Sequence, residues 1–194
     1  MLSVALIISL LLALLPLSGC DDKGMVLYYD LDTEPISLDP QTASSHEEQM
    51  LILNLFEGLT RLDERGQPVL ACAETVDISE DGKVYTFTLR DELKWADDSR
   101  LTAQDFLYAF QRLFQPDTRA PMAESFICLK GAEACLNDGD TGQLGVAAPD
   151  DRTIVFQLAY QNPLFLSLLA TAPAMPCSER FMLSTKGKYG LEAD

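Results

Sequence analysis

The chain has 194 residues, of which 30 are Asp or Glu and 14 are Lys or Arg, so its formal net charge is −16 at pH 7. Such an acidic chain repels phosphate backbones, which argues against nucleic acid as a partner. The length is sufficient for a single domain with a substantial hydrophobic core.

An uncharged apolar segment opens the chain and leads to a cysteine. Residues 1–19 carry no charged side chain, and their apolar run is shorter than the roughly 20 residues that a membrane span needs. They therefore predict a secretory signal peptide. The stretch LSGC at 17–20 resembles a bacterial lipobox, which makes Cys20 a candidate lipid anchor and residues 20–25 a tether. The alternative is an uncleaved N-terminal helix with an incidental cysteine.

The next segments predict a strand and a helix. Residues 25–31 are β-prone, and two prolines interrupt the pattern that follows. Ser45 and Glu48 have the spacing of a capping box. They predict an amphipathic helix over about residues 46–57, with Gly58 as its C-terminal cap.

The middle of the chain predicts a hairpin followed by a second helix. Residues 76–90 alternate as two strands around Asp81-Gly82, which supplies a tight turn. Thr102 and Asp105 have capping-box spacing and open an amphipathic helix that Pro116 ends.

A second strand pair and a third helix follow. The strands are expected on either side of residues 148–152. Pro163 is expected at the first position of a helix that continues through residues 164–170. Hairpins alternating with helices indicate a mixed α/β class and argue against a purely parallel sheet.

The sequence contains no recognisable catalytic or metal-binding constellation. His46 is the only histidine, and a lone imidazole is weak support for a metal or haem site. No GxSxG, Walker or dinucleotide motif occurs, so we expect no enzymatic activity and no cofactor.

The cysteines beyond Cys20 contain no CxxC pair. Cys128 and Cys135 could form a disulfide only if Gly131 breaks the helix between them. Buried free thiols are expected at all four positions, although export would permit disulfides. The four residues are Cys72, Cys128, Cys135 and Cys177.

Five stretches together resemble the N-terminal part of the periplasmic oligopeptide-binding proteins, the extracellular solute-binding family 5 of ABC peptide importers. They are SLDP at 37–40, NLFEGLTRLDERGQPV at 54–69, DGKVYTFTLRDELKWADDSRLTAQDFLYAFQRL at 81–113, LGVAAPDDRTIVFQL at 144–158 and NPLFLSLLA at 162–170. The resemblance implies a two-lobed type II periplasmic-binding fold that closes on its ligand. Residues 26–194 would be an incomplete, N-terminal portion of it.

The resemblance also implies ligand-contacting residues. The segment after SLDP lies beside the bound peptide in this family, and here it is Ala43, Ser44, Ser45 and His46. Met122 stands where peptide binders commonly have a tyrosine, which leaves the class of ligand open.

By contrast, Trp95 is expected to be a core anchor under the hairpin rather than a ligand platform.

The expected function is therefore that of a peptide-binding lipoprotein, located in the periplasm or at the cell surface, that delivers oligopeptides to ABC permease subunits. Cys20 would hold it in membrane lipid. In a Gram-negative host, Asp21 resembles a signal for retention in the inner membrane. The alternatives are a truncated surface lipoprotein without a transport role, or a relative that binds another solute such as a nickel chelate or haem.

Overall fold

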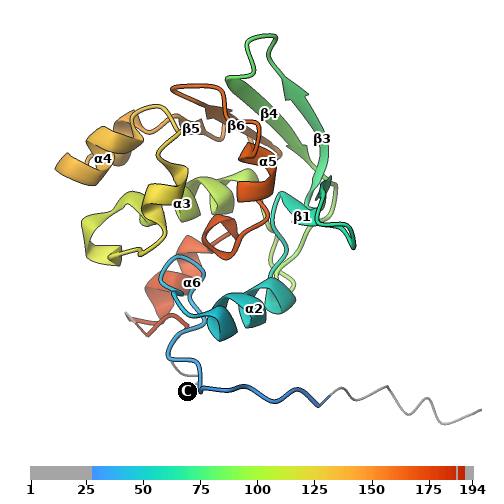
Figure 1. Cartoon of the computed structure of the whole chain (residues 1–194), viewed down its shortest axis with the longest axis vertical. Coiled ribbons are helices and arrows are strands. Elements are labelled where there is room, and N and C mark those ends of the chain that lie inside the picture. The colour runs from blue at the N-terminus through green and yellow to red at the C-terminus, as the bar shows by residue number, and fades with distance from the viewer. Residues whose placement is uncertain (1–27, 187, 191–194) are drawn as a thin grey trace, which may run out of the picture. The chain divides into compact units, whose positions relative to one another are not determined.

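A four-stranded antiparallel sheet organises the unit that begins at Asp32 (Figure 1). The computed structural model describes residues 28–186 and 188–190. The strand order is β3-β4-β6-β5, and a separate antiparallel pair is formed by β1 and β2. The strands are β1 Thr60–Leu62, β2 Pro68–Leu70, β3 Ala73–Ile78, β4 Val84–Leu89, β5 Val146–Ala147 and β6 Thr153–Gln157.

Helices and short 3₁₀ turns connect these strands. The α-helices are α2 His46–Leu55, α3 Ala103–Phe114, α4 Ala132–Asp138, α5 Phe165–Leu168 and α6 Glu179–Ser184. The 3₁₀ turns are η1 Pro116–Thr118, η2 Ala123–Phe126, η3 Thr141–Gln143 and η4 Ala172–Ala174. None of these described helices has the length and hydropathy needed to cross a membrane.

Both predicted capping boxes are confirmed. The Ser45 side chain accepts a hydrogen bond from the Glu48 amide, while the Glu48 carboxylate accepts one from the Ser45 amide. In α3, the Asp105 carboxylate accepts the Thr102 amide at 2.7 Å. These bonds satisfy N–H groups that the first helical turn cannot satisfy itself.

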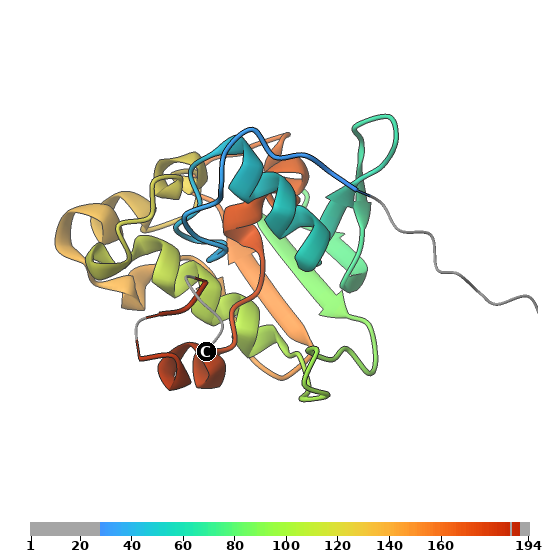
Figure 2. The same cartoon turned by 90° about the horizontal axis from the view of Figure 1, so that it is seen from below.

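The hydrophobic core lies between the sheet and α3, which runs along one face of the sheet (Figure 2). The predicted hairpin is confirmed, since β3 and β4 pair in antiparallel fashion and Gly82 has a positive φ of 63° between them. Alternate side chains of β4 face the core, with Tyr85, Phe87 and Leu89 buried. The strand pair predicted around 148–152 is confirmed as β5 and β6.

The strand predicted at 25–31 is wrong over its described part. Residues 28–31 form no strand, and Tyr28 and Tyr29 are 90% and 65% exposed. A β-prone segment needs a neighbouring strand for its backbone groups, and these residues have none in the described part of the chain. The predicted signal peptide, Cys20 and the tether at 20–25 lie outside the described residues.

Two helix boundaries also differ from the prediction. α2 ends at Leu55, because Phe56 leaves the helix in an extended conformation and places its ring against Trp95. Gly58 is therefore not the helix cap; a Cβ there would lie 3.0 Å from the Leu169 carbonyl oxygen, so a close backbone approach accounts for the glycine.

The helix after Pro163 is much shorter than expected. Only Phe165–Leu168 is α-helical, and Pro163 precedes its N-cap, Leu164. The Asn162 side chain accepts the Leu164 amide at 3.0 Å, so residues 162–164 form a turn.

The cysteine prediction is confirmed, since the cysteines of the described segment are free and buried. Gly131 does interrupt the helical backbone between the two cysteines, because it adopts a left-handed conformation with φ 76° before α4. A Cβ added at this position would lie 2.2 Å from the Gln143 carbonyl oxygen, so no larger residue fits there without a shift of the backbone. Even so, Cys128 and Cys135 do not form a disulfide.

Candidate functional site

The segment that leads into α2 is held by one buried carboxylate. Glu48 is 4% exposed. Its Oε1 accepts the amides of Ile36 and Ser37 at 3.0 and 3.1 Å. Its Oε2 accepts the amides of Ser44 and Ser45 at 2.8 and 3.0 Å. One side chain therefore binds both ends of the segment 36–45.

These bonds also set the acidity of Glu48. Burial acts to raise its pKa, but hydrogen bonds from the backbone amides of Ser45, Ser44, Ser37 and Ile36 outweigh burial and lower the pKa below the ordinary glutamate value. Glu48 is thus held as a carboxylate, the form that accepts all four amides.

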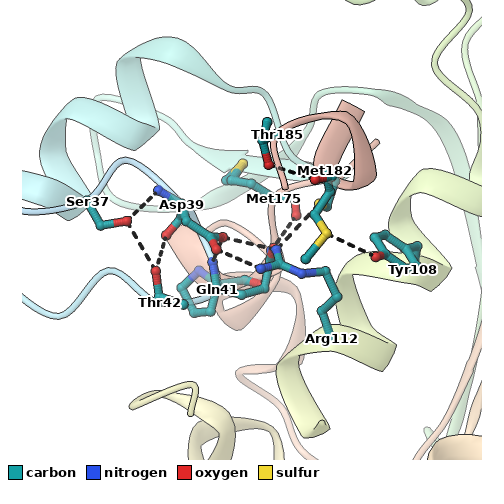
Figure 3. Close-up of polar contacts among 11 residues, drawn as sticks. Ser37, Asp39, Gln41, Thr42, Tyr108, Arg112, Met175, Met182 and Thr185 are labelled. Carbon is teal, nitrogen blue, oxygen red and sulfur yellow. Dashed lines mark hydrogen bonds and ion pairs between the residues drawn. The ribbon is translucent and has the colours of Figure 1, made fainter. Parts of the chain in front are cut away.

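The middle of the same segment is bound by Arg112 of α3 (Figure 3). Nη2 of Arg112 donates to Oδ2 of Asp39 at 2.6 Å, and Nη1 donates to Oδ1 at 3.0 Å. Nη1 also donates to Oε1 of Gln41 at 2.7 Å. Asp39 and Arg112 are each 4% exposed and Gln41 is fully buried, so this is a desolvated, bidentate ion pair.

A third stretch of chain joins this cluster. Nε2 of Gln41 donates to the carbonyl oxygens of Met175 and Pro173 at 3.0 and 3.3 Å. We call Asp39, Gln41 and Arg112, with the carbonyls of residues 173 and 175, the Arg112 clamp.

Two side chains cover the clamp from the C-terminal part of the chain. Nη1 of Arg112 lies 3.4 Å from the Cys177 sulfur, and the guanidinium carbon lies 5.3 Å from the centre of the Tyr189 ring. Burial raises the pKa of the Cys177 thiol to about 11, although Arg112 opposes the increase. For Arg112, burial acts to lower the pKa, but the bond to Asp39 outweighs it and raises the value. The arginine is therefore permanently charged and the thiol neutral.

The predicted ligand-contacting residues have different surroundings. Ala43 is 1% exposed and donates its amide to the Asp39 carbonyl at 3.0 Å. Ser45 is half-buried and caps α2, whereas Ser44 and His46 are exposed. Ser44 and His46 are therefore the members of this segment that a ligand could reach directly.

The start of α2 also has backbone donors that are not used internally. The amides of Glu48 and Gln49 are bonded to the side chain and carbonyl of Ser45. The described residues provide no acceptor for the amides of His46 and Glu47, which are the first two of the helix. The amide of His46, a residue that is exposed, is thus a candidate donor to a ligand.

Met122 is the half-buried residue that precedes η2. Its carbonyl accepts the Ser125 amide at 3.1 Å. No hydrogen bond or ring contact among the described residues joins Met122 to residues 43–46. That Met122 and residues 43–46 contact the same ligand stays a prediction.

A largely apolar groove of about 600 Å³ opens between the end of α2, the turn after β4 and α6. Trp95 lines it and also packs against the core, with its ring 6.4 Å from that of Phe56. The apolar and aromatic residues that line the groove include Leu55, Phe56, Trp95, Pro176, Phe181 and Tyr189. Trp95 is therefore both a packing residue and part of a surface hollow.

The sequence reasoning missed the Arg112 clamp. The SLDP motif contains Asp39, but the motif does not indicate that this aspartate pairs with an arginine 73 residues away. The available signal was the position of Arg112 in α3, three residues after Ala109, on the side of the helix that is buried. A charged residue on a buried helix face requires a partner. The described residues contain no cluster of three or more metal-ligating side chains.

Known proteins share both the sequence and the fold of this chain. The family of bacterial extracellular solute-binding proteins, family 5 Middle, matches residues 67–190. The oligopeptide-binding protein OppA of Bacillus subtilis is 36% identical over 168 residues, which cover 86% of this chain and 31% of OppA. The periplasmic murein peptide-binding protein MppA of Escherichia coli is 42% identical over 157 residues, covering 79% and 29%.

Solved structures agree with these matches. The substrate-binding domain of an oligopeptide ABC transporter from Bacillus anthracis superimposes with a TM-score of 0.81 at 38% identity, covering 85% of this chain and 32% of that one. The expected mixed α/β fold, as part of a periplasmic solute-binding fold, is confirmed. The chain spans about 30% of the length of the relatives it matches.

Proposed function

The chain belongs to family 5 of the bacterial extracellular solute-binding proteins, and from this premise we propose that it contributes to the capture of peptides, outside the cytoplasmic membrane, for an ABC importer. The match of residues 67–190 to the family carries the proposal. The relatives named for oligopeptide and murein peptide binding support a peptide as the ligand. Binding and release, not catalysis, would be the activity, with no cofactor.

The segment 43–46 is the proposed contact with the peptide. Its exposed residues, Ser44 and His46, lie at the start of α2, where the His46 amide has no acceptor among the described residues. A main-chain donor recognises the backbone of a peptide whatever its side chains are, as in strand addition. Met122 would be a further contact with the ligand.

Such a contact supplies only one wall of a binding site. Small-molecule sites usually enclose most of their ligand, and this chain corresponds to about 30% of its relatives. The proposal is therefore best tested in a chimera, in which residues 28–190 replace the matching part of E. coli MppA. Isothermal titration with a pool of tri- to pentapeptides should show binding. A folded chimera that binds no peptide would contradict the proposal.

Replacing His46 with proline in this chimera should weaken peptide binding by about three- to ten-fold, the effect of losing one hydrogen bond. Proline removes the amide hydrogen but suits the first position of a helix. Ser45, with φ −81° and ψ 160°, already has the backbone conformation preferred before proline. Isothermal titration gives the affinities.

The matched control is His46→Ala, which removes the imidazole but keeps the amide. Affinity close to wild type for this variant would assign the effect of proline to the backbone. Equal losses in both variants, or no loss in His46→Pro, would exclude the main-chain contact.

An apolar solute is a second candidate ligand. The groove beside Trp95 has a volume of about 600 Å³ and mostly apolar walls. A relative from E. coli, named the probable deoxycholate-binding periplasmic protein YgiS, is 36% identical over 159 residues. Titrating the chimera with deoxycholate distinguishes the two candidates, because binding of deoxycholate without binding of peptides would favour the second.

We further propose that the protein is a lipoprotein anchored in the membrane through Cys20, and that Asp21 retains it in the inner membrane of a Gram-negative host beside the permease. Metabolic labelling with a fatty-acid analogue should tag the wild type, and Cys20→Ser should abolish the tag. Cys72→Ser, which alters a buried thiol, should leave labelling unchanged. A tag that survives Cys20→Ser would contradict the anchor.

A further inference from the structure

The Arg112 clamp joins segments that are distant in the sequence. Asp39 and Gln41 precede α2, Arg112 belongs to α3, and the carbonyls of Pro173 and Met175 follow α5 (Figure 3). All three clamp side chains are buried. Apart from Nε of Arg112, which has no hydrogen-bond partner among the described residues, their side-chain polar atoms therefore depend on one another and on the carbonyls of residues 173 and 175 for the hydrogen bonds that water would otherwise provide.

The clamp is connected directly to the segment 43–46. The Asp39 carbonyl accepts the amides of Thr42 and Ala43 at 3.1 and 3.0 Å. The Asp39 side chain also accepts the Gln41 amide at 3.1 Å. The residue that binds Arg112 thus also forms the turn from which Ala43 and the following residues emerge.

We propose that Arg112 is a positioning residue for ligand binding: by holding the turn at 39–42, it fixes the position of the backbone of residues 43–46. The contact of residues 43–46 with a ligand rests on the proposed function. The placement of the turn by Arg112 does not, because it is a property of the chain alone.

The geometry explains why an arginine is required. Its planar fork binds both carboxylate oxygens of Asp39 and the side-chain oxygen of Gln41 at once. A lysine would keep the charge but act as a single point donor. Arg112→Lys therefore separates the geometry of the clamp from its charge.

Hydrogen–deuterium exchange of the full chain, read by NMR or mass spectrometry, tests the placement without any ligand. In Arg112→Lys, the amides of residues 42–45 should exchange at least about ten-fold faster, and by a clearly larger factor than those of β4 and β6, which report on global unfolding. The matched control is Arg152→Lys, because Arg152 also pairs with carboxylates, those of Glu74 and Asp91, at 3.0 and 2.9 Å. Arg152→Lys should leave the exchange rates of residues 42–45 unchanged.

The double variant Asp39→Leu/Arg112→Met tests whether the clamp merely fills space. Replacing both partners of a buried ion pair with apolar residues often restores stability, so its melting temperature should approach that of the wild type while residues 42–45 still exchange fast. If the double variant regained both its melting temperature and slow hydrogen exchange at residues 42–45, the proposal would be overturned. Wild-type exchange of residues 42–45 in Arg112→Lys, or a uniform increase that includes β4 and β6, would also overturn it.

Binding is read separately in the MppA chimera. Arg112→Lys should weaken peptide affinity about ten-fold there, with the melting temperature reported alongside. An unmutated chimera that binds no peptide would count against the proposed function and leave the exchange result standing. Fast exchange at 42–45 with unchanged affinity would show that Arg112 does not position the contact.

Discussion

Replacing Phe156 with alanine should lower the free energy of unfolding by about 4 kcal/mol, within the range measured for buried Phe→Ala changes. Phe156 lies in β6 and is fully buried. Its ring centre is 5.9 Å from that of Phe87, 5.0 Å from Phe110 and 5.4 Å from Phe165. The substitution therefore removes the side chain that joins β4, α3 and α5, and leaves a cavity between them.

Urea denaturation followed by circular dichroism gives the measurement. Phe156→Leu keeps most of the volume and should lose clearly less stability than the alanine variant. Tyr160→Ala, at a site that is 51% exposed, should change stability by less than about 1 kcal/mol. If Phe156→Ala destabilised the protein no more than Tyr160→Ala, the core described above would be wrong.

Glu48→Ala should lower the free energy of unfolding by about 3 kcal/mol, because it leaves four backbone amides without their acceptor. Those of Ile36 and Ser37 bind one carboxylate oxygen, and those of Ser44 and Ser45 bind the other. Glu48→Gln keeps one acceptor oxygen and should lose about half as much. Chemical denaturation at pH 7 measures both.

The contribution of Glu48 should depend on pH in a defined direction. Its pKa in the folded chain is lowered, so its stabilisation is fully present above the ordinary glutamate pKa of about 4.3 and is lost as the pH falls through the lower, folded value. The difference in stability between wild type and Glu48→Gln should therefore shrink below pH 4. A difference that stayed constant down to pH 2 would contradict the carboxylate's role.

Glu47→Ala is the matched control for Glu48. Glu47 lies in the same helical turn, but no hydrogen bond to its side chain is found in the described part of the chain. Glu47→Ala should lower the free energy of unfolding by no more than about 0.5–1 kcal/mol, through the lost interaction of the carboxylate with the helix dipole. An equal loss for Glu47→Ala would mean that the four amides contribute little.

The local elements of this protein were readable in the sequence because their causes are local. Ser45 and Glu48, or Thr102 and Asp105, are three residues apart, and the caps they form need no distant partner. Gly82 supplies the positive φ of its turn. The alternation of β4 directly predicted which of its side chains are buried.

The candidate site was only partly predictable. The resemblance to a known family indicated the segment 43–46, but periodicity and composition could not show that Ala43 is buried while Ser44 and His46 are exposed. That difference arises from hydrogen bonds of the Asp39 carbonyl and the Glu48 carboxylate, which turn the backbone at this point.

The sequence alone determined the capped helices, the hairpins and the family, since each follows from neighbouring residues or from an ordered set of motifs. Only the tertiary structure decided that Asp39 and Arg112 meet, that Phe56 turns toward Trp95, and that a groove opens beside them. The physical reason is separation along the chain. A buried charge requires a partner, but only the packing of α3 against the segments before α2 and after α5 brings that partner within hydrogen-bonding distance.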